Sequence, residues 1–374
     1  MEINNKVIGI LGTAKNTGKT TTFNFLLEWS NLESIKVGLT SIGYDGEDID
    51  NITGLPKPRI FVQKDNTIAT AEQCLFSLED KIKTIEKTDV HTALGRVVIG
   101  KARKEGLVVL AGPNKGIELQ VIIQKLKQQK TEIILVDGAL NRMIPLIYCD
   151  ALILTTGASR HTDIDLLVDE IESMSRVFTL PLRKHKQVSN KELKMYQNNI
   201  VIIQKKGNPI LLKGHSLINQ KTFDSLINII GNQECEEIYI PGIISDTVLK
   251  KIINKYYLLF QRKTIIINNP AFLLVGSRYI GYLKDIIDDI LSRGIKLKTL
   301  YKLPILAVTI NPFYPKYSRF GKDSYEAAYI DEEQLYQKMK KEVPFPVINI
   351  KGEGSTKLEM IIKKFLNISI RKNA

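Results

Sequence analysis

The sequence has few cysteines and histidines and no long hydrophobic run. Its three cysteines, Cys74, Cys149 and Cys235, stand too far apart to form a disulfide framework or a zinc-ligand pattern. The four histidines are equally scattered. No apolar stretch reaches the roughly 18–20 residues that cross a bilayer, and the first residues lack the basic and apolar regions of a signal peptide. We therefore expect a cytoplasmic protein with reduced thiols and no membrane partner.

Internal repeats and low-complexity tracts are also absent from the sequence. The composition is 44% hydrophobic and 25% charged, which is ordinary for a globular protein. A chain of 374 residues is long enough to form two domains, each with its own hydrophobic core.

The net charge of +13 lies in the second half of the chain. Residues 1–175 contain 20 Lys and Arg against 23 Asp and Glu, whereas residues 176–374 contain 33 against 17. A basic half can bind nucleic acid or an acidic protein surface, or its charge can simply be solvated. Because the charges are dispersed and no RNA- or DNA-binding motif is present, we favour solvation and expect no nucleic-acid partner.

Short apolar runs alternate with helical patterns over the first 175 residues. Buried strands are predicted at 6–12, 36–41, 107–111, 132–136 and 151–155, and helices at 20–30, 118–128 and 162–175. The alternation predicts an α/β fold with a mostly parallel sheet. Residues 55–105 differ, because Pro56 and Pro58 exclude a helix and only short strands are indicated, so a β-rich insertion or edge is expected there.

The segment after the first strand reads Gly-Thr-Ala-Lys-Asn-Thr-Gly-Lys-Thr-Thr. A phosphate loop has the pattern G-x-x-x-x-G-K-[ST], which Gly18-Lys19-Thr20 matches, although Thr13 stands at the first glycine position and Gly12 lies one residue earlier. Such a loop offers backbone N–H groups to phosphate oxygens at the positive end of a helix. Lys19 would then lie near the β- and γ-phosphates, and the Thr20 hydroxyl would reach Mg²⁺. The predicted nucleotide-contacting residues are Gly12, Thr13, Ala14, Lys15, Asn16, Thr17, Gly18, Lys19, Thr20 and Thr21.

Acidic residues follow two of the predicted strands. Asp137 ends the run Ile133–Val136, where a carboxylate would lie beside a metal, although it could instead cap the turn at Gly138. The loop 42–50 contains Asp45 and Asp48, which are candidates to position a metal-bound water or the attacking nucleophile. A solvated loop is an equally good interpretation. The predicted metal ligands are Thr20, Asp48 and Asp137, and the predicted catalytic residues are Lys19 and Asp45.

Other strand-end loops contain polar residues that could bind base, substrate or phosphate. These candidates are Asn114, Lys115, Ser159 and Arg160, and for each a plain connecting loop is at least as good an interpretation. The segment 114–117 begins like the Asn-Lys-x-Asp stretch of a guanine site but lacks its aspartate, which favours ATP over GTP.

Two domains are expected. Residues 1–177 form a phosphate-loop NTPase domain that contains the β-rich segment, and residues 178–374 form a basic α/β domain of unknown role. In the second domain, strands are predicted at 200–204, 210–212, 237–240, 264–267 and 305–309, and helices at 246–257, 282–293 and 356–365. The boundary is placed near Pro181 and the basic run at 183–186.

The loop at 12–20 has the extra-residue spacing of dethiobiotin synthetase-like NTPases, and this resemblance covers roughly residues 1–175. A closer resemblance rests on the segments 12–22, 39–48, 53–59, 111–115, 136–142 and 156–160. These resemble the smaller ATP-binding subunit of the lysine 5,6-aminomutase reactivase. The resemblance implies that Lys19, Thr20 and Asp137 contact phosphate and Mg²⁺.

The same resemblance implies two partners, a MutS-related reactivase subunit and an adenosylcobalamin-dependent aminomutase of lysine degradation. ATP hydrolysis would drive a conformational change that restores a mutase with a damaged cofactor. A different class is an ATP-dependent ligase that activates a substrate carboxylate, for which Lys15 and Lys115 could supply cations near the γ-phosphate. A nucleic-acid-binding ATPase rests only on the basic second half and ranks last.

Overall fold

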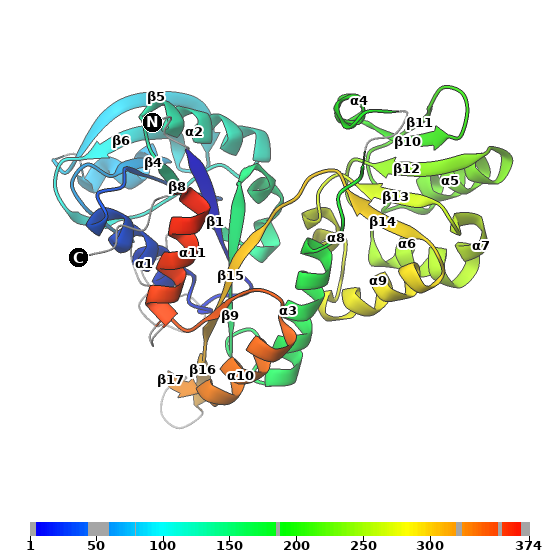
Figure 1. Ribbon diagram of the computed structural model, residues 1–374. Helices are drawn as coiled ribbons and strands as arrows, with labels where there is room; N and C mark the ends of the chain where they lie inside the picture. Colours follow the sequence, from blue (N-terminus) through cyan, green and yellow to red (C-terminus); the bar gives the residue numbers. More distant parts are fainter. Residues whose placement is uncertain are drawn as a thin grey trace. The chain divides into compact units, whose positions relative to one another are not determined.

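The computed structural model describes residues 5–43, 60–78, 80–184, 188–318, 324–350 and 354–367. The chain forms two compact units: unit 1 contains residues 1–167 and 304–374, and unit 2 contains residues 168–303 (Figure 1). In the described parts of the chain, no helix is both long and apolar enough to span a membrane.

Unit 1 is built on a nine-stranded sheet in the order β18-β15-β9-β1-β8-β2-β4-β6-β5. Neighbouring strands from β18 through to β4 in this order are parallel. The sheet then continues with β6, which is antiparallel to both β4 and β5. The predicted α/β class with a mostly parallel sheet is therefore confirmed. The strand bounds are β1 Lys6–Gly12, β2 Val37–Ser41, β4 Thr67–Ala71, β5 Ile82–Thr92, β6 Gly95–Ala102, β8 Ile133–Ala139, β9 Ala151–Gly157, β15 Ile305–Asn311 and β18 Val347–Ile348.

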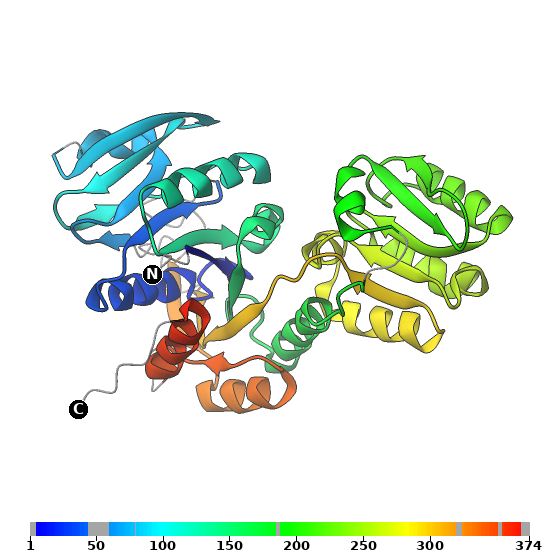
Figure 2. The same cartoon turned by 45° about the horizontal axis from the view of Figure 1, so that its top comes forward.

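Helices cover both faces of this sheet (Figures 1 and 2). On one face, α1 (Lys19–Leu32) and α11 (Gly354–Leu366) share an apolar cluster with Ile8 and Ile10 of β1. On the other, α2 (Gly116–Gln128) packs beside the short helix η3 (Ile144–Tyr148). Coverage of both faces explains why the central strands are continuous apolar runs with no polar alternation.

The β-rich region lies at one edge of the main sheet. β4 pairs in parallel with β2 and antiparallel with β6, so the region extends the sheet and does not form a separate layer. A second ribbon pairs β3 (Ile60–Val62) with β7 (Gly106–Val108), and η1 (Glu72–Leu78) connects β4 toward β5. The expected β-rich edge is confirmed for the residues that the structure describes, although β5, with 11 residues, is longer than the short strands that were predicted.

The structure corrects the predicted division into residues 1–177 and 178–374. After unit 2 the chain returns to unit 1 at Pro304, where β15 pairs with β9 and β18 pairs with β15. The hairpin β16 (Phe313–Ser318) and β17 (Ser324–Tyr329), the helix α10 (Glu332–Glu342) and α11 follow. Local periodicity identifies β15 as a strand but contains no information about its pairing partner, which is why the boundary was wrong.

Unit 2 is a second α/β unit, entered through α3 (Ile164–Phe178). Its sheet has the order β11-β10-β12-β13-β14, in which β12, β13 and β14 are parallel and β10 is antiparallel to both neighbours. The strands are β10 Asn199–Gln204, β11 Ile210–Lys213, β12 Cys235–Ile240, β13 Thr264–Ile267 and β14 Lys296–Thr299. The helical segments are α4 Asn190–Met195, α5 Gln220–Asn232, α6 Asp246–Lys251, η4 Ile252–Tyr256, α7 Tyr257–Phe260, α8 Ala271–Val275, η5 Ile280–Tyr282 and α9 Leu283–Ser292.

A fully buried ion pair lies in unit 2. The Arg183 guanidinium donates to the Glu237 carboxylate from Nε at 3.0 Å and from Nη2 at 2.7 Å. Its Nη1 donates to the backbone oxygen of Val188 and to Oδ1 of Asn190. Both charged side chains are at most 1% exposed. These hydrogen bonds offset the free-energy cost of removing the two charges from water.

Candidate nucleotide-binding site

The segment 13–18 connects the carboxyl end of β1 to the first turn of α1. Gly18, at the helix N-cap, has φ 90° and ψ 9°, a left-handed conformation that glycine adopts without steric cost. Asn16 also has a positive φ, 61°, which asparagine tolerates better than most residues. Turns that alternate between right- and left-handed backbone form concave groups of N–H donors, which are anion-binding shapes.

Two threonines attach the loop to β9. The backbone N–H of Thr13 donates to Thr155 O at 2.9 Å, and the Thr13 hydroxyl donates to Thr156 Oγ1 at 3.1 Å. The Thr17 hydroxyl donates to Ala14 O at 2.9 Å and lies 3.3 Å from Thr155 Oγ1. Thr13 is only 4% exposed and Thr17 only 1%, so their side chains point into the protein. Although Thr13 stands at the first glycine position of the pattern, its side chain therefore does not occupy the solvent-facing side of the loop.

Residues of β15 support the loop from a second direction. Asn311 Nδ2 donates to Asn16 O at 2.7 Å, at the position of positive φ. Two residues earlier in β15, the Thr309 hydroxyl lies 3.0 Å from the Thr22 hydroxyl in α1. Sequence reasoning missed both residues. Asn16 and Asn311 are 295 residues apart, and the only available signal was a polar residue at the end of an apolar strand.

The structure brings Lys19 and Asp137 together. Lys19 Nζ lies 3.2 Å from Asp137 Oδ1, and each side chain is 17% exposed. The parallel register places Asp137 level with Ile10 of β1 and Ser41 of β2, at the carboxyl edge of the sheet. A cation and a carboxylate that are both partly exposed thus meet beside the loop, and the Asp137 Oδ1 atom that contacts Lys19 is itself buried.

The remaining loop residues differ in exposure. Lys15 and Thr21 are exposed, whereas Ala14 and Thr20 are half-buried, and Thr20 lies in the first turn of α1. The predicted residues Asp45 and Asp48 fall outside the described residues.

The other predicted candidates lie in two different settings. Asn114 lies at the carboxyl end of β2, because a Cβ built on Gly43 would be 2.6 Å from its Oδ1. The Lys115 side chain is 77% exposed and pairs with Glu118 of α2 at 3.1 Å. The Ser159 hydroxyl donates to Phe313 O at 3.0 Å, and Arg160 N donates to Gly157 O. Ser159 thus holds the start of β16 beside the end of β9.

Arg142 is a further residue at this edge that was not among the predicted site residues. A Cβ on Gly43 would lie 2.1 Å from Arg142 Nη1, so the guanidinium lies beside the backbone at the end of β2.

The connections that follow β1 and β8 run in opposite directions along the sheet. From β1 the chain continues past β8 to β2, whereas from β8 it continues past β1 to β9. Open α/β sheets bind ligands where neighbouring connections diverge in this way.

The donor set fits a phosphate-bound Mg²⁺. In the part of the chain that the structure describes, no group of three or more His, Cys, Asp and Glu could hold a metal ion. Mg²⁺ is usually held by one or two carboxylates together with substrate phosphates and waters. Asp137 and Thr20 can provide the protein ligands of such a site.

Comparison with known proteins leaves the family open. No protein-family model and no curated protein matches the chain. The solved structure described as "Structure of pNOB8 ParA bound to nonspecific DNA" is similar over 77% of this chain and 98% of that chain, at 11% identity and a TM-score of 0.21. A TM-score this low carries no argument about function.

Proposed function

We propose that unit 1 binds ATP with Mg²⁺ in the loop at residues 12–21 and hydrolyses it. The observation that carries the proposal is the position of Lys19, which lies beside Asp137 at the start of α1, directly after a loop with two residues of positive φ. In this proposal Lys19 and the loop N–H groups hold the phosphates, and Thr20 and Asp137 hold Mg²⁺. When bound there, Mg²⁺ would supply positive charge that neutralises the negative charge developing on the phosphates.

For the physiological role, we propose the ATP-binding subunit of a chaperone that reactivates an adenosylcobalamin-dependent aminomutase. The described parts of the segments that resemble the reactivase subunit support this proposal. They include the loop, the end of β2, residues 136–142 and residues 156–160, which lie at the carboxyl ends of β1, β2, β8 and β9 of one sheet. Residues 111–115 follow β7 of the separate ribbon but contact the end of β2, where the Gly112 N–H donates to Gly43 O at 3.1 Å. Segments scattered over the sequence would be expected to meet in this way if they serve one nucleotide-dependent mechanism.

A carboxylate-activating ligase is the second candidate function, and Arg142 is the observation that favours it. Its guanidinium lies at the same edge of the sheet, beside Gly43 and Asn114. A guanidinium binds a carboxylate through two parallel hydrogen bonds, which is how a ligase could position a substrate near the nucleotide.

Calorimetric titration of the full chain with Mg²⁺ and ATP tests the nucleotide site. We expect Lys19→Ala to weaken ATP binding at least 100-fold, because the ammonium is lost from the phosphates while the fold, checked by circular dichroism, is retained. Lys36→Ala is a matched control, because Lys36 is exposed and precedes β2 at the opposite end of that strand. Equal ATP affinities for wild type and a folded Lys19→Ala protein would reject the site.

ATP turnover separates the two candidate functions. If turnover rises when an inactivated aminomutase and a MutS-related subunit are added, and mutase activity returns, the reactivase proposal is supported. If turnover instead requires only a small carboxylic acid and yields an acyl phosphate or its product, the ligase is supported and the reactivase rejected.

A further inference from the structure

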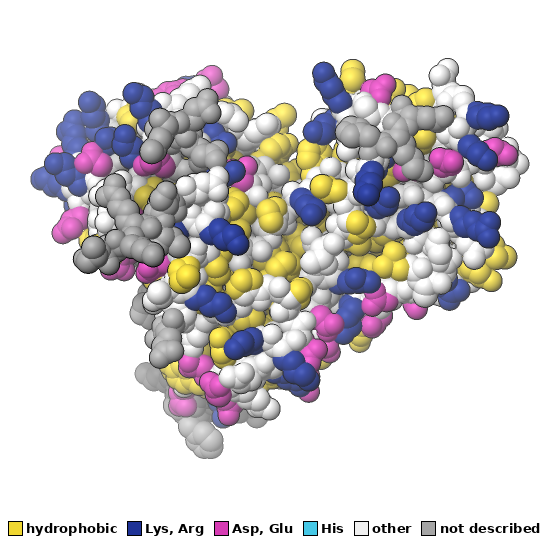
Figure 3. All heavy atoms as spheres, in the orientation of Figure 1, with side chains coloured by type: hydrophobic (Ala, Val, Ile, Leu, Met, Phe, Trp, Pro, Cys, Tyr) yellow, Lys and Arg dark blue, Asp and Glu magenta, His cyan; other side chains and the backbone are white. Residues whose placement is uncertain are grey.

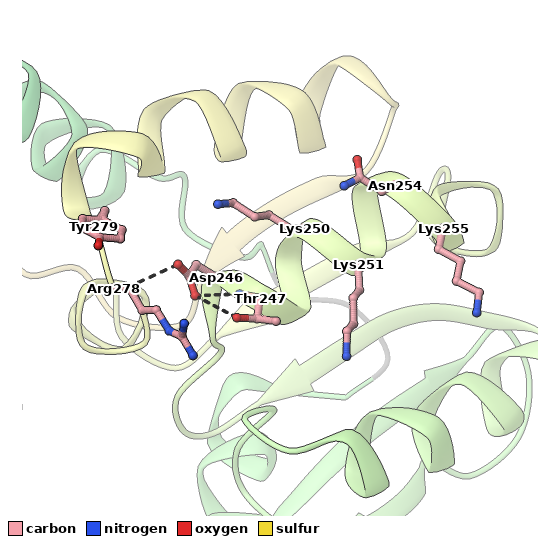
Figure 4. A pocket seen from close by; sticks show the side chains of 8 residues that line it. All are labelled: Asp246, Thr247, Lys250, Lys251, Asn254, Lys255, Arg278 and Tyr279. Carbon is pink, nitrogen blue, oxygen red and sulfur yellow. Dashed lines mark hydrogen bonds between the residues drawn. The ribbon is translucent and has the colours of Figure 1, made fainter.

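A hollow of about 410 Å³ opens on the surface of unit 2, remote in sequence from the phosphate loop. The hollow runs along α6 and the π-helical turn η4 and is bounded at one end by the segment after α8 (Figure 4). Its lining residues are Asp246, Thr247, Lys250, Lys251, Asn254, Lys255, Arg278 and Tyr279. All eight lie in unit 2, so the hollow is complete within that unit.

The charge around this hollow is strongly positive. Four cations, Lys250, Lys251, Lys255 and Arg278, line it against a single acid, Asp246. Unit 2 as a whole contains 21 Lys and Arg against 12 Asp and Glu, a net charge of +9 in the sequence. On the face of the molecule in Figure 3, Lys and Arg side chains are spread across unit 2.

The one carboxylate has a structural role. Asp246 is only 8% exposed, and its Oδ1 accepts hydrogen bonds from the Thr247 N–H at 2.7 Å and the Thr247 hydroxyl at 3.3 Å. Its Oδ2 accepts from the backbone N–H of Arg278 at 3.4 Å (Figure 4). Asp246 therefore fixes the segment of Arg278 against α6, and the surface of the hollow that faces solvent is left to the cations.

Two aromatic rings stand at the Arg278 end. Tyr279 is 69% exposed and Tyr282 is 60% exposed, and their ring centroids are 6.1 Å apart in an edge-to-face arrangement. Exposed aromatic rings beside several cations are a combination by which proteins hold single-stranded nucleic acids, with phosphates on the cations and a base stacked on a ring.

We propose that this hollow binds single-stranded nucleic acid, with Lys250, Lys251, Lys255 and Arg278 on the phosphates and Tyr279 stacked on a base. The lining favours a strand over a small molecule, because Thr247, Lys250, Asn254, Lys255, Arg278 and Tyr279 are exposed. A small-ligand site usually encloses about 70–90% of its ligand, which such a lining does not do. The tyrosine rings favour a nucleic acid over an acidic peptide. This proposal is independent of the nucleotide site in unit 1.

Fluorescence anisotropy with a labelled 12-nucleotide DNA or RNA strand and the full chain tests the proposal. The titration is repeated from about 50 to 300 mM salt in the Lys19→Ala background, which removes binding at the phosphate loop. Four phosphate contacts give a slope of log K against log salt of about −3 for a single strand. Replacing Lys250 and Arg278 with alanine should reduce the slope to about −1.4 and weaken binding roughly 25-fold at about 0.1 M salt.

Matched variants separate specific contacts from total charge. Lys213→Ala with Lys296→Ala removes the same charge from exposed positions of unit 2 outside the hollow, and should weaken binding less than threefold. Tyr279→Ala should weaken binding about tenfold, and Tyr279→Phe should restore it because the ring is retained. Equal loss in both double variants, tighter binding of a mononucleotide or a poly-glutamate peptide than of the strand, or no binding to any strand would each overturn the proposal.

Discussion

Replacing Asn311 with alanine should weaken ATP binding while unit 1 stays folded. Asn311 ends β15, and its side-chain amide donates to the backbone oxygen of Asn16 at 2.7 Å. Asn16 has a φ of 61°, so this bond holds the one non-glycine residue of the loop that is in the left-handed conformation. Removing the amide leaves the loop attached to β9 by Thr13 and Thr17 but releases it from β15.

The size of the effect follows from the energy of one hydrogen bond. A buried or half-buried hydrogen bond contributes about 0.5–1.5 kcal/mol net, and about 1.4 kcal/mol corresponds to tenfold in an equilibrium constant. If the loop must hold its ordered form to bind phosphate, the loss appears as a smaller binding-competent fraction. We therefore expect ATP affinity to fall about two- to tenfold, and the free energy of unfolding of unit 1 to fall by about 1 kcal/mol.

The assay pairs calorimetric ATP titration with urea denaturation. Asn66→Ala is the matched control, because the Asn66 amide donates to Asn31 Oδ1 at 2.7 Å, is 3% exposed and lies in the turn before β4. This control should lose stability but keep its ATP affinity. The reasoning is refuted if folded Asn311→Ala protein binds ATP as tightly as wild type, or if both variants lose affinity equally.

Three other predictions concern packing and reactivity. Gly157→Ala places a Cβ 2.0 Å from the backbone oxygen of Asn311, so the ends of β9 and β15 must separate; we expect a loss of about 2 kcal/mol or more in urea denaturation, and a loss under 0.5 kcal/mol would contradict the geometry. Arg183→Met leaves the Glu237 carboxylate buried and unpaired, and should cost about 3–5 kcal/mol in the unfolding of unit 2; a loss below about 1 kcal/mol would show that the pair is dispensable. Burial raises the pKa of the Cys149 thiol far above its usual range, so a thiol reagent at pH 8 should modify it only after denaturation, and rapid labelling of the native protein, located by mass spectrometry, would contradict that burial.

Much of unit 1 was predictable because its central strands are buried on both faces. Such strands are continuous apolar runs, and the predicted segments at Lys6–Gly12 and Ala151–Thr155 coincide with β1 and most of β9. The phosphate-loop pattern likewise placed the strand-to-helix turn, because Gly18 is needed there for its positive φ. These features depend on local sequence, which is why a single sequence reveals them.

The parts that escaped prediction depend on contacts between distant residues. β15 was expected as a strand, but its run Ile305–Thr309 does not indicate that it pairs with β9 of the first unit. The support of Asn16 by Asn311 and of Thr22 by Thr309 follows from that pairing, so it could not be inferred before the sheet order was known. Arg142 was overlooked for a similar reason, because its neighbour Gly43 belongs to another strand end.

The return of the chain at Pro304 has a consequence for synthesis of the protein. Asn16 leaves the ribosome 295 residues before Asn311, a delay of roughly 15–60 s at about 5–20 residues per second. The contiguous residues of unit 2 emerge during that interval, whereas β9 cannot pair with β15 until β15 has been synthesised. The phosphate loop is thus among the last features to be completed in the nascent chain. A product truncated before β15 would present the Gly-Lys-Thr motif without the strand that supports it.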